Sequence, residues 1–160
     1  MPEVLVALSV LAVGFIGVWT SAGQCLQIAR AHRETIAATE VLMRRVEDCR
    51  STGWNTILTP EGIKENILNM SATDATALPG IEEKITITPY PAVTPATTPI
   101  VVARHTNGTV EILSAPTPGV YLRAFLAVRV DFQLTWQSGS TKRPRKRELS
   151  TVISAQALLR

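Results

Sequence analysis

The chain has 160 residues, of which 46% are hydrophobic and only 5% aromatic, and its formal net charge is +3. That charge is too small to indicate a nucleic-acid-binding protein by itself, and so few aromatic residues give little support for a base-stacking surface. Much of the hydrophobic content is concentrated in the first 29 residues. The composition therefore predicts one membrane segment followed by one small domain.

The N-terminal segment reads MPEVLVALSVLAVGFIGVWTSAGQC, and apart from Glu3 it contains no charged residue before Arg30. An uncharged run of about 26 residues is longer than the roughly 20 helical residues that cross the hydrocarbon core of a bilayer. It lacks the basic start of a secretory signal peptide and exceeds the usual length of its apolar region. We therefore expect a retained membrane helix.

Glu3 is the unusual residue of this run, because an ionised carboxylate near the hydrocarbon core is costly. Taken alone it has an ordinary interpretation, since a helix N-terminus favours negative charge by about 0.3–1 kcal/mol. The apolar sequence that follows Glu3 instead favours a specific role for this carboxylate.

The helical pattern continues beyond the apolar run, because no Pro or Gly occurs between residues 24 and 52. Leu42, Val46 and Cys49 recur at the spacing of one helix face. The sequence predicts a single helix of nearly 50 residues, about 70 Å long, with Gly53 as the C′ residue that ends it. The expected organisation is a transmembrane and assembly half of this helix at 1–29, its amphipathic half at 30–53, and a globular domain at 54–160.

Strand patterns dominate the second half of the chain. KITIT (84–88) and VRVDFQLTW (128–136) alternate between apolar and polar residues, as strands do when one face lies on a core and the other in water. IVVARHTNGTVEIL (100–113) is predicted to be a hairpin, because Asn107-Gly108 suits a type I′ turn. The Pro-rich segment 89–99 is predicted to be a loop that cannot be a central strand.

Two further segments complete the predicted domain. A short helix is expected around Pro60–Met70, with Thr59 as its N-cap. Residues 137–147 are expected to turn the chain, and 148–159 to begin as a returning strand. The predicted fold class is therefore α+β, with a long N-terminal helix packed on a small antiparallel β-sheet.

The sequence does not indicate a catalytic site. Its two histidines, His32 and His105, belong to no Ser/His/Asp order or metal-spaced cluster, and there is no glycine-rich phosphate loop. Cys25 and Cys49 are about 36 Å apart along the predicted helix, too far for an intrachain disulfide. We expect a protein that is not an enzyme and that holds no cofactor or metal.

The most conspicuous charged feature is a run of basic residues around Pro144. One interpretation is a solvated hairpin loop whose charges keep the sheet edge soluble. The other is an anion-contacting loop that binds phosphates of lipid headgroups or DNA, or an acidic protein. The Pro and the absence of interleaved aromatics weaken the DNA version. The basic residues are Lys142, Arg143, Arg145, Lys146 and Arg147.

The stretch PEVLVALSVLAVGFIG resembles the start of mature type IV pilins and type II secretion pseudopilins. In this family a leader ending in Gly is followed by an aromatic residue, two further residues, an apolar residue or Pro, then Glu and an apolar helix. Glu3 matches the family's glutamate, and Pro2 and Met1 match the two positions before it. The cleavage-site Gly and the residue that becomes the methylated N-terminus are absent, which implies a longer reading frame or a truncated form.

The resemblance extends to two later segments. ARAHRETIAATEVLMRRVEDCRSTGW (29–54) is similar to the distal half of the minor-pilin helix. VRVDFQLTWQSG and KRELSTVIS, within 128–154, are similar to the closing strands of small pseudopilins, where a strand ending in Trp is followed by a polar loop and a returning strand.

The resemblance implies a minor pilin or minor pseudopilin in which Glu3 neutralises the N-terminal amine of an adjacent subunit during filament assembly. The implied partners are other pilin or pseudopilin subunits, an inner-membrane assembly platform, the prepilin peptidase and membrane lipid. The implied location is the inner membrane, single-pass, with the domain periplasmic or extracellular. Arg30 and Arg33 alone would favour a cytoplasmic domain, but a basic leader would hold the N-terminus in the cytoplasm instead.

Two alternatives belong to other classes of protein. A membrane-anchored extracytoplasmic binding module would use the basic loop to contact DNA or anionic lipid. An anchored periplasmic enzyme would need His32 or His105 for its activity.

Overall fold

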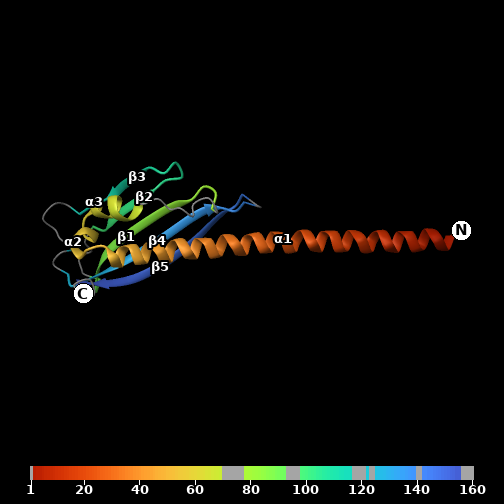
Figure 1. Ribbon diagram of the computed structural model, residues 1–160, viewed down its shortest axis with the longest axis horizontal. Coiled ribbons are helices and arrows are strands. Elements are labelled where there is room, and N and C mark those ends of the chain that lie inside the picture. The colour runs from red at the N-terminus through yellow and green to blue at the C-terminus, as the bar shows by residue number, and fades with distance from the viewer. Residues whose placement is uncertain are drawn as a thin grey trace.

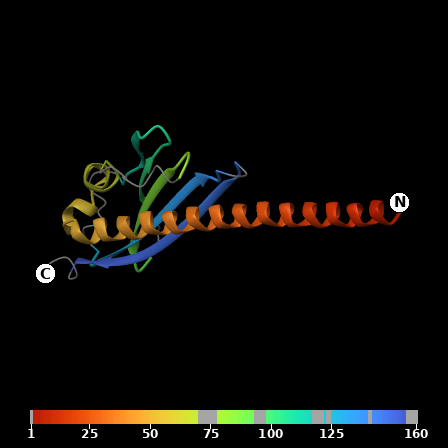
Figure 2. The same ribbon diagram turned by 45° about the vertical axis from the view of Figure 1, so that its right-hand side comes forward.

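A long helix packed on an antiparallel sheet forms the fold (Figure 1). The computed structural model describes residues 2–69, 78–92, 98–116, 122, 125–139 and 142–155. Helix α1 (Pro2–Ser51) has 50 residues, and its N-terminal half extends well beyond the rest of the fold (Figures 1 and 2). The predicted α+β fold class is confirmed, and the architecture is pilin-like.

The sheet has the strand order β3-β2-β1-β4-β5, and all neighbouring strands are antiparallel. Strand β4 confirms the alternation predicted from its sequence, because its core-facing side chains are at most 3% exposed. These side chains are Val128, Val130, Phe132, Leu134 and Trp136. The strands are β1 (Glu82–Tyr90), β2 (Ile100–Arg104), β3 (Val110–Ser114), β4 (Ala127–Gln137) and β5 (Pro144–Ser154).

One face of the C-terminal part of α1 covers this sheet. The predicted stripe of Leu42, Val46 and Cys49 is buried, and Ala38 and Val41 extend it toward the N-terminus. The spacing of these residues returns them to one side of the helix. Each fully buried Leu or Val side chain stabilises the fold by about 1.5–3 kcal/mol, so this face fixes the helix on the sheet.

Three short helical segments close the end of the core. The Thr59 hydroxyl accepts a hydrogen bond from the Gly62 N–H at 3.2 Å, and Pro60 occupies the first helical turn. The predicted helix and its cap are confirmed, although Met70 lies outside the described residues. The segments are α2 (Trp54–Ile57), α3 (Pro60–Ile63) and the π-helix η1 (Lys64–Leu68). Their fully buried side chains are Ile57, Ile63, Ile67 and Leu68.

The end of α1 differs from the prediction. Gly53 is extended, with φ −62° and ψ 145°, and is the N-cap of α2. It is therefore not a left-handed C′ residue. The helix ends at Ser51, and the Thr52 N–H donates to the Asp48 carbonyl at 3.0 Å, so the last turn is closed without a glycine.

The β2–β3 hairpin is present, but its turn is not type I′. A type I′ turn needs a positive φ at both central residues, whereas at this turn only Gly108 has one, of 84°. The Gly108 N–H donates to the His105 carbonyl at 2.8 Å. The β-turn therefore spans residues 105–108. The Asn107 side chain stabilises it by accepting a hydrogen bond from the Thr109 N–H at 2.9 Å.

The predicted loop at 89–99 begins too early, because Pro89 and Tyr90 belong to β1. Strand β1 is central, yet its pairing with β2 stops at Ile87, while Pro89 still pairs with Val128 of β4. Pro is excluded from positions that need a ladder bond on both sides, and Pro89 has a paired strand on one side only. Residues 93–97 lie outside the described residues.

Candidate functional site

The N-terminal half of α1 is a fully exposed apolar helix. An 18-residue window within it has a mean hydropathy of 2.2, and none of that window is buried in the fold. By length and composition this helix can cross a membrane. Its large exposed side chains include Phe15 (70%) and Trp19 (84%). A surface of this size and character needs lipid or other helices around it.

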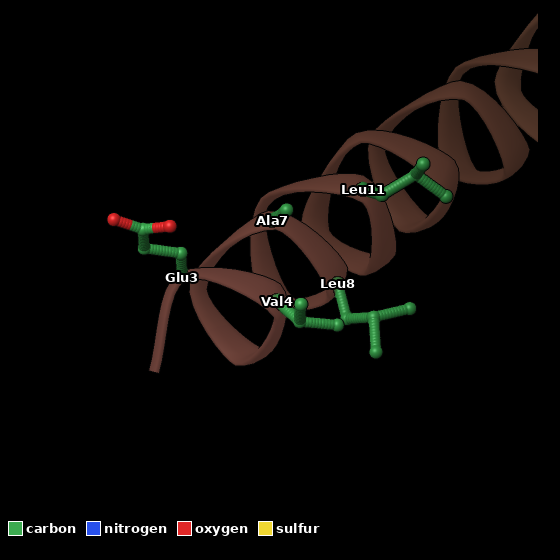
Figure 3. Close-up of a pocket in the computed structure, with 5 residues that line it drawn as sticks. All are labelled: Glu3, Val4, Ala7, Leu8 and Leu11. Carbon is green, nitrogen blue, oxygen red and sulfur yellow. The ribbon is translucent and has the colours of Figure 1, made fainter. Parts of the chain in front are cut away.

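Glu3 lies in the first turn of this helix and points away from its axis (Figure 3). Residues seven positions apart return to within about 20° of the same helix face. Ala7, Gly14 and Ser21 therefore form a line of small residues on the face that carries Glu3. A Cβ placed on Gly14 would have no atom within 4 Å, so another helix could approach closely there. The apolar surface beside Glu3 is lined by Val4, Ala7, Leu8 and Leu11.

The face that carries Glu3 remains uncovered along the folded part of the helix. Thr39 lies 36 residues after Glu3, which is about ten turns, and so it occupies the same face. Thr39 is exposed, whereas Ala38, about 100° around the helix, is fully buried against the sheet. His32 is exposed and Met43 is 56% exposed on the uncovered side. The described part of the sheet thus leaves the Glu3 face of α1 free as far as Thr39, whereas Met43 borders a groove that Leu149 and Thr151 of β5 also line.

A buried ion pair joins α1 to the sheet. The Arg45 Nε donates to the Glu83 Oε2 at 2.7 Å and its Nη2 to the Oε1 at 3.1 Å, and both side chains are 4% exposed. Arg45 also donates to the Ile67 carbonyl and contacts Asp48 at 3.4 Å, while Arg104 contacts Glu83 at 3.4 Å. Burial lowers the pKa of Arg45, but the hydrogen bond and charge of Glu83, with the charge of Asp48, outweigh it and raise that pKa.

A second polar contact joins α1 to the end of the β4–β5 hairpin. Glu34 is 9% exposed, and its Oε1 accepts from the Gly139 N–H at 3.0 Å. The Ser138 N–H donates to the Arg143 carbonyl at 2.9 Å, and the Lys142 N–H donates to the Ser138 carbonyl at 2.8 Å. These bonds close the hairpin and hold its end beside the first charged turn of α1.

The predicted basic loop is only partly a loop. Lys142 and Arg143 belong to the turn, but β5 begins at Pro144, so Arg145, Lys146 and Arg147 are strand residues and the predicted start at 148 is wrong. These three pair with Trp136, Thr135 and Leu134 of β4. Strand β5 begins before residue 148 because the buried residues Leu134 and Trp136 fix the register of β4, and residues 144–147 pair with that part of β4. Lys146 also contacts Glu148 at 2.6 Å.

The residues that join α1 to the sheet were missed from the sequence. Glu34, Ala38, Val41 and Arg45 follow the helical spacing of the buried face, but a search for apolar periodicity passes over the two charged members. The position of the two charged residues, Glu34 and Arg45, on an otherwise apolar helix face is the signal that could have identified them.

The remaining candidate residues do not form a common site in the described part of the chain. His32 is exposed, and the His105 Nε2 lies 3.1 Å from the Glu111 Oε2. Cys25 is exposed and Cys49 buried, both as free thiols. Burial and the charge of Asp48 raise the pKa of Cys49 to about 12, against a smaller opposing effect of Arg45.

Comparisons with protein-family models, with curated proteins and with solved structures found no match to this chain. The resemblance to pilins and pseudopilins therefore depends on the residues around Glu3, on the segments 29–54 and 128–154, and on the shape of the fold.

Proposed function

We propose that this chain is a non-enzymatic structural subunit, a minor pilin or minor pseudopilin, of a type IV pilus-like filament or a type II secretion pseudopilus. The observation that carries the proposal is the form of α1. One half is an exposed apolar helix with Glu3 in its first turn, and the other half is the packed core helix of a folded domain. One continuous helix of this kind can serve first as a membrane anchor and then as the core of a filament.

In this proposal the subunit first resides in the inner membrane with its domain outside the cytoplasm. On assembly its apolar half exchanges lipid contacts for contacts with other subunits, guided by the inner-membrane platform. Ala7, Gly14 and Ser21 allow neighbouring helices to approach. Glu3 pairs with the terminal amine that prepilin peptidase exposes on an adjacent subunit. Two unpaired charges in lipid are each costly, and pairing removes much of that cost.

The uncovered face of α1 supports this assembly mode. The stripe from Glu3 to Thr39 stays clear of the sheet, because the buried face is about 100° away. A neighbouring helix can therefore contact α1 along both halves without displacing the domain. The domain then lies outside the helical bundle.

The experiment replaces Glu3 with Gln, which keeps the size of the side chain and removes its charge. Glu3→Asp is the matched control, because it keeps the charge at the same position. In native cells, Glu3→Gln should still resist alkaline carbonate extraction from membranes but should be lost from the sheared filament or pseudopilus fraction. Glu3→Asp should enter that fraction. Normal assembly of Glu3→Gln would contradict the proposed role.

A membrane-anchored binding module gives a different result in the same experiment. Such a protein would remain in the membrane, would never enter a filament fraction, and would not respond to Glu3→Gln. Its absence from that fraction in the unmodified form would refute the filament proposal.

A further inference from the structure

We infer that basic residues at the membrane-proximal end of the domain bind the phosphate headgroups of anionic lipid and hold the domain on the membrane surface. This inference rests on the membrane-inserted stage of the proposed function and adds a ligand to it. We call this group of residues the basic tip. It consists of Arg30, Arg33, Lys142, Arg143, Arg145, Lys146 and Arg147.

The fold brings the two parts of the basic tip together. The β4–β5 hairpin points along α1 toward its N-terminus in both views (Figures 1 and 2). The hydrogen bond between Glu34 and Gly139 fixes the hairpin end next to the helical turn that contains Arg30 and Arg33. Along the sequence these two groups of basic residues are more than a hundred positions apart.

The height of the tip matches the headgroup layer. The apolar run ends at Ala29, and Glu34 is five residues further, which is about 7 Å along the helix axis. The interfacial layer on each side of the hydrocarbon core is about 5–7 Å thick. A helix that spans the core up to Ala29 therefore places the hairpin end at the outer edge of the headgroups.

Charge at this end differs from the rest of the chain. The chain has 16 basic and 13 acidic residues. The segments 30–34 and 137–148 hold seven of the basic and two of the acidic ones, Glu34 and Glu148, which leaves nine basic and eleven acidic residues elsewhere. The adjoining start of β1 adds Glu82, Glu83 and Lys84, a net charge of −1, and the Glu83 carboxylate is buried against Arg45. The positive surplus of the whole protein thus lies at its membrane-proximal end.

The basic side chains are available to a ligand. Lys142, Arg143 and Arg147 are exposed, as are Arg30 and Arg33, whereas Arg145 is half-buried and the exposed Lys146 is paired with Glu148. Attraction of such residues to an anionic surface decays over about 8 Å at physiological ionic strength. The helix holds the tip within that distance, so lipid phosphate is favoured over DNA, which nothing in the fold brings near.

The test uses the full chain in vesicles of phosphatidylcholine, with or without phosphatidylglycerol. A fluorophore is attached at Gln137→Cys in a Cys25→Ser background, and a nitroxide on the lipid headgroups quenches it. The test variant is Lys142→Gln, Arg143→Gln and Arg147→Gln. The control variant, Arg50→Gln, Lys64→Gln and Arg129→Gln, removes the same number of charges away from the tip.

Phosphatidylglycerol should raise quenching roughly twofold for the parent and control proteins, and the test variant should stay at the phosphatidylcholine value. High salt should abolish the increase. Equal quenching of the parent protein in both lipids would overturn the inference. A test variant whose quenching still rises with phosphatidylglycerol, as in the parent, would also overturn it. If phosphatidylglycerol has no effect, but added duplex DNA changes the quenching of the parent and not of the test variant, the inference is also overturned.

Alkaline carbonate extraction of the same vesicles separates the two proposals. A chain that stays inserted but does not respond to phosphatidylglycerol overturns the basic tip alone. A chain that is released overturns the membrane stage of the proposed function and the basic tip with it.

Discussion

Arg45 of α1 and Glu83 of β1 form a charge pair in the core, with 2.7 Å between Nε and Oε2 and 4% exposure of each side chain. Because α1 is one continuous helix, this pair ties the sheet to the same element that carries Glu3. The orientation of the domain relative to the apolar half is therefore set within the subunit, before any neighbour binds.

Arg45→Ala should lower the free energy of unfolding by about 3–5 kcal/mol, because it leaves Glu83 buried without its main partner. Urea unfolding in mild detergent, followed by tryptophan fluorescence, measures the change. The double variant Arg45→Met, Glu83→Leu removes both charges and should recover most of the loss. Single and double variants with equal stability would contradict a paired role for these residues.

Glu34→Ala should destabilise the protein by about 0.5–1.5 kcal/mol, because the exposed Gly139 N–H exchanges the Glu34 carboxylate for water. Hydrogen exchange should show faster exchange of the Gly139 amide, while the amides of β1 keep their protection. Glu40→Ala, at an exposed position six residues further along the same helix, is the control and should change neither quantity. Unchanged exchange at Gly139 would mean that the carboxylate does not hold the hairpin end.

Gly62→Ala should destabilise the domain by about 1–3 kcal/mol through overpacking. A Cβ at Gly62 would lie 2.1 Å from the Thr56 carbonyl oxygen and 2.6 Å from the Thr59 Oγ1, so the cap of α3 must move. At Gly53 the nearest such atom is the Thr56 Oγ1 at 3.9 Å, and φ is ordinary. Gly53→Ala should therefore be tolerated, and equal unfolding midpoints for the two variants would contradict the contact.

The Cys49 thiol should resist alkylation. Its pKa is raised to about 12 by burial and the neighbouring Asp48, so at pH 8 its thiolate fraction is about a thousandfold below that of a thiol with a pKa near 9. In a Cys25→Ser variant, labelling should be slow in the folded protein and fast in urea. Rapid labelling of the folded protein at pH 8 would contradict the burial of Cys49.

The same pKa shift predicts a dependence of stability on pH. Above pH 9 the thiol ionises in the unfolded chain but not in the folded one, so stability falls as pH rises from about 9 to 12, by at most about 1.4 kcal/mol per unit. Cys49→Ala lacks this thiol and should show a shallower decline over that range. Parallel curves for the two proteins would contradict the shift.

Periodic apolar residues predicted the fold well. The alternation from Val128 to Trp136 and the helical stripe of Leu42, Val46 and Cys49 both lie on the core as expected. Both patterns arise because the buried positions of a strand or helix are apolar, so they can be seen in the order of apolar and polar residues. The long helix could also be predicted, because the apolar run is long enough to form a membrane helix and no Pro or Gly interrupts residues 24–52 after it.

Pairing between strands was harder to predict, because it depends on partners that are distant in the sequence. Pro144 and the basic residues after it have the composition of a loop, yet register with Trp136 and Leu134 makes them a strand. Pro89 is accepted in β1 because β2 stops at Ile87. For the same reason the sequence alone did not place Arg30 and Arg33 beside the hairpin end.

The most direct measurement for the central claim is mass spectrometry of the N-terminal peptide, from native membranes with and without prepilin peptidase activity. Assembly through Glu3 requires a peptide that begins a few residues before Met1, is N-methylated, and disappears when the peptidase is absent. That peptide supplies the amine with which Glu3 is proposed to pair. A peptide that begins at unmodified Met1 and does not depend on the peptidase would contradict the account and leave α1 as a simple membrane anchor.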